Sequence, residues 1–172
     1  VPTTLVTNCL FVNTKILEEC GFGVPETWEE IEAMIPALTE KGYIPVALGA
    51  KTKGRVGHWH TNLAMKMYGL DYCSQLIAGE EKWTGEKMKN VTDKLASFIE
   101  EGMFGEFAIS DDMSAQLARF MNGEAAMLLE VSGNIAQLEN MDDKDYVEIV
   151  KVPYFADKPE NKDLWFICPA DG

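Results

Sequence analysis

The chain has 172 residues, a formal net charge of −13 and 47% hydrophobic residues. This is enough for one globular domain with its own core and short for two. The acidic excess argues against a nucleic-acid partner, because such binding depends on Lys and Arg neutralising phosphates. No stretch approaches the roughly 18 consecutive apolar residues that a membrane-spanning helix needs.

The chain also lacks the spacing of a metal site. Its four cysteines are scattered without a C-x-x-C pair, and only His58 and His60 offer imidazole ligands, so zinc spacing is absent. We expect no metal and no cofactor. Cys9 and Cys20 stand among apolar positions, and we interpret them as buried thiols rather than as disulfide partners.

The first fifty residues predict strand, helix, helix and strand. Residues 1–12 are rich in β-branched and apolar residues, and Asn13 suits the cap of a short helix over 14–20. A second helix begins after Thr27, which forms a capping-box pattern with Glu30. Pro36 predicts a kink in this helix or two shorter helices. A strand follows at 43–48.

Two helical patterns occupy the middle of the chain. After a polar, basic loop over 49–57, residues 58–68 predict a helix that Gly69 closes. Thr84 is then expected to cap a longer helix that ends at Gly102. Its apolar stripe consists of Met88, Val91, Leu95, Phe98 and Ile99.

The last third predicts a helix, a buried strand and a short helix, followed by two further strands. Asp111 or Asp112 opens the first helix, whose inward residues are expected to be Ala115, Ala118 and Met121. The remaining elements are a strand over 125–131, a helix from the capping residue Ser132 to about Asn140, and strands over 146–152 and 164–168. Because strands alternate with helices, the fold class is α/β, three-layered, with helices on both faces of a small sheet.

Several segments, in order, resemble the bacterial extracellular solute-binding proteins that serve sugar ABC importers. One is the PETW sequence at 25–28, followed by KGYIPVALG at 41–49. The others are residues 10–17, with Val12 where the family usually has Tyr, the junction at 21–28, FMNGEAAM at 120–127, and Val152-Pro153.

The resemblance implies a periplasmic-binding-protein-like type II fold, in which crossing strands join two α/β lobes and the ligand lies between them. Residues 1–152 would form one lobe, and residues 153–172 the hinge strand and the start of the return to the other lobe. The chain begins at Val1 with neither an initiator Met nor a secretory signal. We therefore expect it to be part of a longer, two-lobed protein.

The resemblance also implies a function. Members of this family bind a solute outside the cytoplasm, in the periplasm or as membrane-anchored lipoproteins, and deliver it to a membrane permease. We expect the ligand to be a mono- or oligosaccharide that hinge closure captures. The resemblance implies a binding protein and not an enzyme.

Six residues are candidates for ligand contact. Trp59, at the start of a helix after a Gly-containing loop, offers an aromatic face for a sugar, and His58 lies beside it. The opposing interpretation packs Trp59 into the core with Leu63 and Met67, and makes His58 a surface or capping residue. The other candidates are Glu130, Ser132, Asn134 and Asn8, with Tyr154 and Trp165 as weaker ones.

The turn after the strand over 125–131 departs from the family. Family members often carry a sugar-stacking Trp where this chain has Gly133. Ser132 could instead act only as a helix cap. Glu130 is harder to explain structurally, because a carboxylate in an apolar strand needs a partner or a wet cleft.

Two other functional classes remain open from the residues. Glu130 with Asp111 or Asp112 could form the acid/base pair of a carbohydrate hydrolase, although no G-x-S-x-G, H-E-x-x-H or P-loop motif occurs. An exposed apolar patch could make the chain a protein-interaction module. The basic cluster of Lys51, Lys53 and Arg55 is expected to be a solvated loop rather than an anion site.

Overall fold

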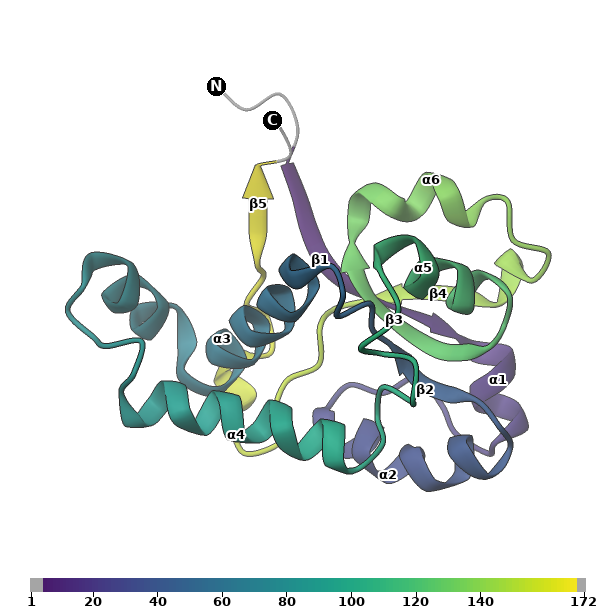
Figure 1. The fold of residues 1–172 in the computed structure, drawn as a ribbon, viewed down its shortest axis with the longest axis horizontal. Coiled ribbons are helices and arrows are strands. Elements are labelled where there is room, and N and C mark those ends of the chain that lie inside the picture. Colours follow the sequence, from purple (N-terminus) through teal and green to yellow (C-terminus); the bar gives the residue numbers. More distant parts are fainter. Residues whose placement is uncertain (1–4, 170–172) are drawn as a thin grey trace.

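The computed structural model describes residues 5–169 and places a five-stranded mixed sheet at the centre of the fold (Figure 1). Four strands follow the order β2-β3-β1-β4, and β5 pairs with β1. Strands β2 and β3 are parallel, whereas β1 is antiparallel to each of its partners. The strands are β1 (Leu5–Asn13), β2 (Ile44–Ala47), β3 (Ala125–Val131), β4 (Val147–Val150) and β5 (Ile167–Pro169).

Helices cover both faces of this sheet. They are α1 (Thr14–Glu19), α2 (Trp28–Glu40), α3 (Lys53–Ala78), α4 (Glu86–Glu100), α5 (Met113–Met121) and α6 (Ile135–Leu138). Side chains alternate along β1: Leu10 and Val12 join the core with α1 to α4, whereas Cys9 and Phe11 join the core with α5 and α6. The predicted α/β class with three layers is therefore confirmed.

Helix α2 follows its sequence signals closely. The Thr27 hydroxyl accepts a hydrogen bond from the Glu30 amide at 3.2 Å, and the Glu30 carboxylate accepts one from the Thr27 amide at 3.0 Å. The helix continues through Pro36, so the alternative of two shorter helices is wrong. The buried residues Ile35 and Leu38 hold both sides of the proline against the core.

Helix α3 is longer than the sequence predicted. It begins at Lys53, within the segment that was predicted to be a loop. Gly54 and Gly57 weaken the helical pattern in the sequence but do not prevent a helix from forming. It breaks at Gly69, where φ is 80° and ψ is 178°, and then resumes to Ala78. The second part was not predicted. Tyr72 and Leu76, four residues apart, bury its inner face.

The start and the inner face of α4 also differ from the prediction. Gly85, and not Thr84, is the N-cap residue, and no side chain caps this end. Met88, Val91, Leu95 and Phe98 are buried as expected, but Ile99 is 59% exposed and was wrongly assigned to the stripe. Ile99 directly follows Phe98, so its side chain points about 100° further around the helix, toward solvent.

Helix α5 is capped by Asp112, whose carboxylate accepts hydrogen bonds from the Ser114 and Ala115 amides at 3.0 Å. Its buried face consists of Gln116, Leu117 and Phe120. Of the residues predicted to face inward, Met121 packs partly buried against the core, Ala115 is half-buried and Ala118 is exposed, so the predicted face is confirmed only at Met121. Leu117 and Phe120, the larger apolar side chains, decide which face of the helix turns inward, and Gln116 is buried between the helix and β3.

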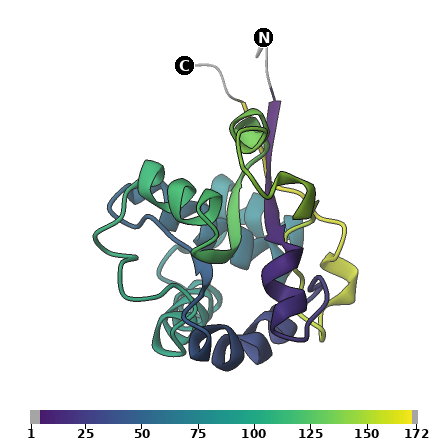
Figure 2. The ribbon, with the colours of Figure 1, turned by 90° about the vertical axis from the view of Figure 1, so that its right-hand side faces the viewer.

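Three short 3₁₀ turns complete the chain: η1 (Ser132–Asn134), η2 (Lys144–Tyr146) and η3 (Pro159–Asn161). The start of β1 and the end of β5, which are the two ends of the described chain, pair with each other at one end of the molecule (Figures 1 and 2). Within residues 5–169, none of the helices combines the length and the apolar character needed to cross a bilayer.

Candidate functional site

Polar side chains gather at the end of the sheet where β3 finishes. Asn8 of β1 lies opposite Val131 of β3, and Cys9 lies opposite Glu130. Ser132 follows directly, and its hydroxyl accepts a hydrogen bond from the Thr7 amide at 3.2 Å. The antiparallel register of β1 and β3 thus brings the backbones of three predicted residues close together, from positions more than 120 residues apart. Because side chains alternate along a strand, Glu130 points to the face that α5 covers and Asn8 to the other face.

Glu130 is a buried carboxylate with three partners. It is 1% exposed and forms an ion pair with the Arg55 guanidinium. Its carboxylate also accepts hydrogen bonds from the Gln116 side chain at 2.6 Å and from the Val131 amide at 2.7 Å. The expectation that this carboxylate needs a partner is confirmed, and the partner is a residue that we had placed in a solvated loop.

Close packing of the loop after β2 supports this ion pair. The Gln116 side chain accepts a hydrogen bond from the Gly49 amide at 2.6 Å. A Cβ atom at Gly49 would lie 2.3 Å from the Asp112 carbonyl oxygen, so only glycine permits this approach. Sequence reasoning missed both Arg55 and Gln116 as site residues. The signal available was the unmatched charge of Glu130, which called for a cation nearby.

Asn8 differs from the other polar residues of the site. It is 1% exposed, and neither its side-chain nitrogen nor its side-chain oxygen has a hydrogen-bond partner within residues 5–169. Its backbone amide donates to the Phe166 carbonyl at 3.1 Å. A buried amide that lacks partners costs free energy, and such a group calls for an explanation.

His58 on α3 packs against Phe166, the residue whose carbonyl accepts a hydrogen bond from the Asn8 amide. Its ring is 6.0 Å from the ring of Phe166, measured between centroids, in an edge-on arrangement. Burial and then the Arg55 cation lower the His58 pKa from its ordinary value, against a smaller opposing effect of Glu130. The lowered pKa favours a neutral imidazole, which can both donate and accept a hydrogen bond.

Trp59 does not reach the site. It is 1% exposed and packs its ring 4.7 Å from Phe104 and 5.4 Å from Trp28, measured between centroids. The interpretation of Trp59 as a sugar platform is therefore corrected: it is a core residue. Its spacing with Leu63 and Met67 suited either role, and the aromatic neighbours Phe98 and Phe104 give the indole a complete apolar enclosure.

Asn134 is half-buried in η1, and its side-chain oxygen accepts a hydrogen bond from Gln137 at 2.9 Å. It lies two residues beyond Ser132, at the rim of the site. Ser132 makes no capping hydrogen bond to the turn that it opens. The alternative role of Ser132 as a helix cap is thus contradicted, and its hydroxyl instead joins β3 to β1.

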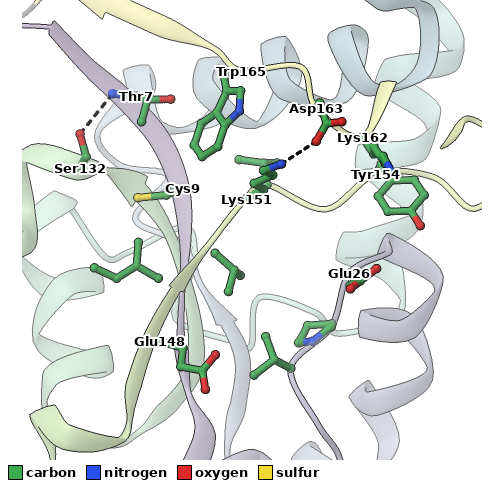
Figure 3. Close-up of a pocket in the computed structure, with 15 residues that line it drawn as sticks. Thr7, Cys9, Glu26, Ser132, Glu148, Lys151, Tyr154, Lys162, Asp163 and Trp165 are labelled. Carbon is green, nitrogen blue, oxygen red and sulfur yellow. Dashed lines mark hydrogen bonds and ion pairs between the residues drawn. The ribbon is translucent and has the colours of Figure 1, made fainter. Parts of the chain in front are cut away.

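A groove of about 840 Å³ lies beside β1 and β4 (Figure 3). Trp165, Thr7 and Ser132 lie at its upper part in this view, and the Lys151–Asp163 ion pair of 2.5 Å crosses it. Tyr154 lies at its far side. Of the weaker candidates, Trp165 and Tyr154 therefore both line one groove, with Trp165 nearest the strands that carry Asn8 and Ser132.

The carboxylates proposed for hydrolysis are already engaged. Asp111 forms an ion pair with Arg119, and Asp112 caps α5. Within the described part of the chain, no three His, Cys, Asp or Glu residues group as metal ligands would. Cys9, Cys20 and Cys73 are free thiols, and burial raises the pKa of the Cys9 thiol to about 12, so this thiol stays protonated.

Comparison with known proteins identifies the family. The sequence profile of the family described as bacterial extracellular solute-binding protein matches residues 1–167. A curated relative, a probable sugar-binding periplasmic protein of Rhizobium meliloti (strain 1021), is 24% identical over 156 residues, which are 86% of this chain and 33% of that protein.

Solved structures agree on the fold. A chitin oligosaccharide binding protein superposes with a TM-score of 0.88 at 23% identity, over 98% of this chain and 43% of its own. A solute-binding protein in complex with raffinose gives a TM-score of 0.75 at 19% identity, over 98% of this chain and 44% of its own. The chain thus spans a third to less than half the length of these proteins. Because the family profile covers nearly the whole sequence, this chain belongs to the bacterial extracellular solute-binding proteins.

Proposed function

We propose that this chain forms one lobe of a receptor that captures a carbohydrate outside the cytoplasm for an ABC importer. In this proposal residues 1–152 form the lobe, and residues 153–172 form the hinge strand and the start of the return to a second lobe. The ligand is held by closure of the two lobes. Family membership and the sugar-binding relatives support this function.

The observation that carries the proposal is the unpartnered amide of Asn8. Within residues 5–169 its donor and its acceptor are both unused, although the residue is 1% exposed. A sugar hydroxyl both donates and accepts, so it can satisfy an amide that offers both functions. Ser132, Asn134 and His58 lie around the same end of the sheet and complete the candidate ligand face.

Glu130 enters the proposal as a support for this face. Its ion pair with Arg55 fixes the first turn of α3 against the end of β3. Such a pair orders the polar groups around it and lends a defined shape to the ligand side. Direct contact between Glu130 and a sugar would require one of its present partners to move.

The two rival functions have less support. Glu130 and Asp111 are each paired with a different arginine and Asp112 caps α5, so the carboxylates considered for glycoside hydrolysis are already engaged. Large exposed apolar side chains such as Ile77, Ile109 and Trp83 are distributed over different elements. We propose that the receptor is not an enzyme, that a lipid anchor holds it at the membrane, and that it delivers its ligand to a permease.

The test uses the complete receptor and a panel of mono- and oligosaccharides. A bound sugar should raise the melting temperature by several degrees at saturation, and calorimetric titration then gives its affinity. Replacing Asn134 with alanine should weaken that affinity about fivefold, the equivalent of about 1 kcal/mol for one hydrogen bond. Asn140→Ala, at the exposed end of the α6 segment, is the matched control and should bind normally.

Two results would contradict the proposal. One is a panel in which no saccharide changes the melting temperature. The other is release of reducing sugar from a glycoside, which would indicate catalysis rather than capture.

A further inference from the structure

Lys66 is a fully buried lysine in the middle of α3, with 0% of its surface exposed. Its ammonium donates three hydrogen bonds to backbone carbonyls, at 3.2 Å to Asn161, 3.0 Å to Lys162 and 2.9 Å to Leu164. The Asn161 side chain donates in return to the Lys66 carbonyl at 3.0 Å. One side chain therefore joins residues 161–164 to a helix almost a hundred residues away.

The local shape of α3 matches this arrangement. The helix breaks at Gly69, and a Cβ atom there would lie 3.3 Å from the Asn161 side-chain oxygen. Burial and, to a lesser extent, the Lys151 cation lower the Lys66 pKa to about 8, against an opposing effect of Asp163. Burying an ammonium costs free energy. Lys66 must therefore make interactions here that an apolar side chain could not make.

That reason lies in the backbone of residues 161–164. Three carbonyls of an irregular segment converge on one point, where a methionine or leucine would leave those of Lys162 and Leu164 without a donor; the Asn161 carbonyl would keep its hydrogen bond from the Leu164 amide. An ammonium supplies three donors, which is the number required.

The same segment leads directly into the candidate ligand face. Trp165 lines the groove together with Thr7 and Ser132 (Figure 3). The Phe166 carbonyl accepts a hydrogen bond from the Asn8 amide at 3.1 Å, and the ring of Phe166 packs against that of His58. The position of residues 161–164 therefore determines where these two aromatic residues lie.

We propose that Lys66 is a positioning residue for the ligand site: it fixes residues 161–164 against α3 and so sets the places of Trp165 and Phe166. This role rests on the proposed function, because it assigns Lys66 an effect on ligand affinity as well as on local structure.

The test compares Lys66→Met, Lys66→Arg and the control Lys89→Met in the complete receptor. Lys89 lies on α4 with 71% of its side chain exposed, so its replacement makes the same charge change at the surface. Hydrogen exchange should become at least tenfold faster for amides of residues 161–167 in Lys66→Met, with β3 amides changed far less. Lys66→Arg, which keeps a cation with several donors, should restore most of this protection, and Lys89→Met should match the wild type.

Sugar affinity is the second measurement, taken at a temperature where every variant is folded. Lys66→Met should bind at least fivefold more weakly, and Lys66→Arg should recover much of the loss. Faster local exchange with unchanged affinity would overturn the positioning role, as would an equal rise in exchange along the whole chain.

If Lys66→Met does not fold, Asn161→Ala removes the return hydrogen bond and should give the same local pattern in weaker form; unchanged exchange there overturns the proposal. If no sugar binds even the wild type, the proposed function fails. The exchange comparison still decides separately whether Lys66 fixes residues 161–164.

Discussion

Strand β1 carries two buried asparagines, one in its middle and one at its last position, and the two behave differently. Asn13 and Asn8 are each 1% exposed. The Asn13 side-chain oxygen accepts a hydrogen bond from the Ile16 amide at 3.2 Å and caps α1. Neither side-chain atom of Asn8 has a partner among the described residues.

We interpret the difference as that between a structural polar group and one that binds a ligand. A capping asparagine stabilises the fold, because it satisfies a helix amide that would otherwise lack an acceptor. An unpartnered buried amide destabilises the fold by an amount of the order of 1–3 kcal/mol. Retention of Asn8 at such a cost agrees with a ligand that completes its hydrogen bonds.

The largest expected effect comes from removing the buried carboxylate of Glu130, which lies one register position from Asn8 on the opposite face of the sheet. Glu130→Leu leaves the Arg55 cation without its partner, and breaking a buried pair in this way costs about 3–5 kcal/mol. Urea denaturation should show this loss as a lower midpoint with an unchanged slope. The loss of stability should be local, with faster hydrogen exchange of amides in β3 and in the first turns of α3.

Glu124→Leu is the matched control for this change. Glu124 also pairs with an arginine, Arg119, but 47% of its side chain is exposed, so its loss should cost below 1 kcal/mol. Equal losses for the two variants would show that burial does not distinguish these ion pairs.

The second prediction concerns Asn8 itself. Asn8→Leu has a similar side-chain volume and removes an unsatisfied amide, so the free energy of unfolding should stay equal or rise by about 1 kcal/mol. The sugar affinity of the complete receptor should fall at least tenfold. Denaturation and calorimetric titration measure the two effects, and a variant that is less stable yet binds normally would reverse the functional interpretation.

The third prediction is the opposite pattern for Asn13, the last residue of β1: lower stability with unchanged sugar affinity. Asn13→Ala removes the cap of α1 and should lower the free energy of unfolding by about 1 kcal/mol. Sugar affinity should remain unchanged when measured well below the melting temperature. A loss of affinity from this substitution would mean that the two asparagines do not differ in role.

The sequence was sufficient to predict the elements with local signals. The capping box of Thr27 and Glu30, the cap at Asn13 and the buried strand 125–131 all depend on neighbours within a few residues. The break at Gly69 was located, but the continuation of α3 beyond it depends on packing of Tyr72 and Leu76 in the core, which a local pattern does not contain.

The site could be predicted only in part, for a different reason. Asn8, Glu130 and Ser132 were each named as candidates, but the pairing of β1 with β3 that brings their backbones close was not predicted. The role of Trp59 was ambiguous, since apolar residues at four-residue steps suit either a core or a ligand face. The ion pair of Glu130 joins residues 75 positions apart and the pairing around Asn8 joins residues more than 120 apart, and no sequence pattern specifies such contacts.

The smallest expected effect is acid sensitivity at the Asn8 end. Burial and Arg55 lower the His58 pKa in the folded chain, so below about pH 6.5 the unfolded chain binds a proton that the folded chain does not. Stability should therefore fall as the pH drops from 7.5 to 5.5, by less than the loss of the Asn13 cap. Urea midpoints across this range should depend less on pH in His58→Gln. His60→Gln is the comparison on the same helix: burial lowers the His60 pKa too, so this substitution should also reduce the pH dependence, but its ring contacts Thr92 and its replacement should leave ligand affinity unchanged. An undiminished pH dependence in His58→Gln would place the acid sensitivity elsewhere, whereas a reduced one would show that the folded chain disfavours the protonated form of His58.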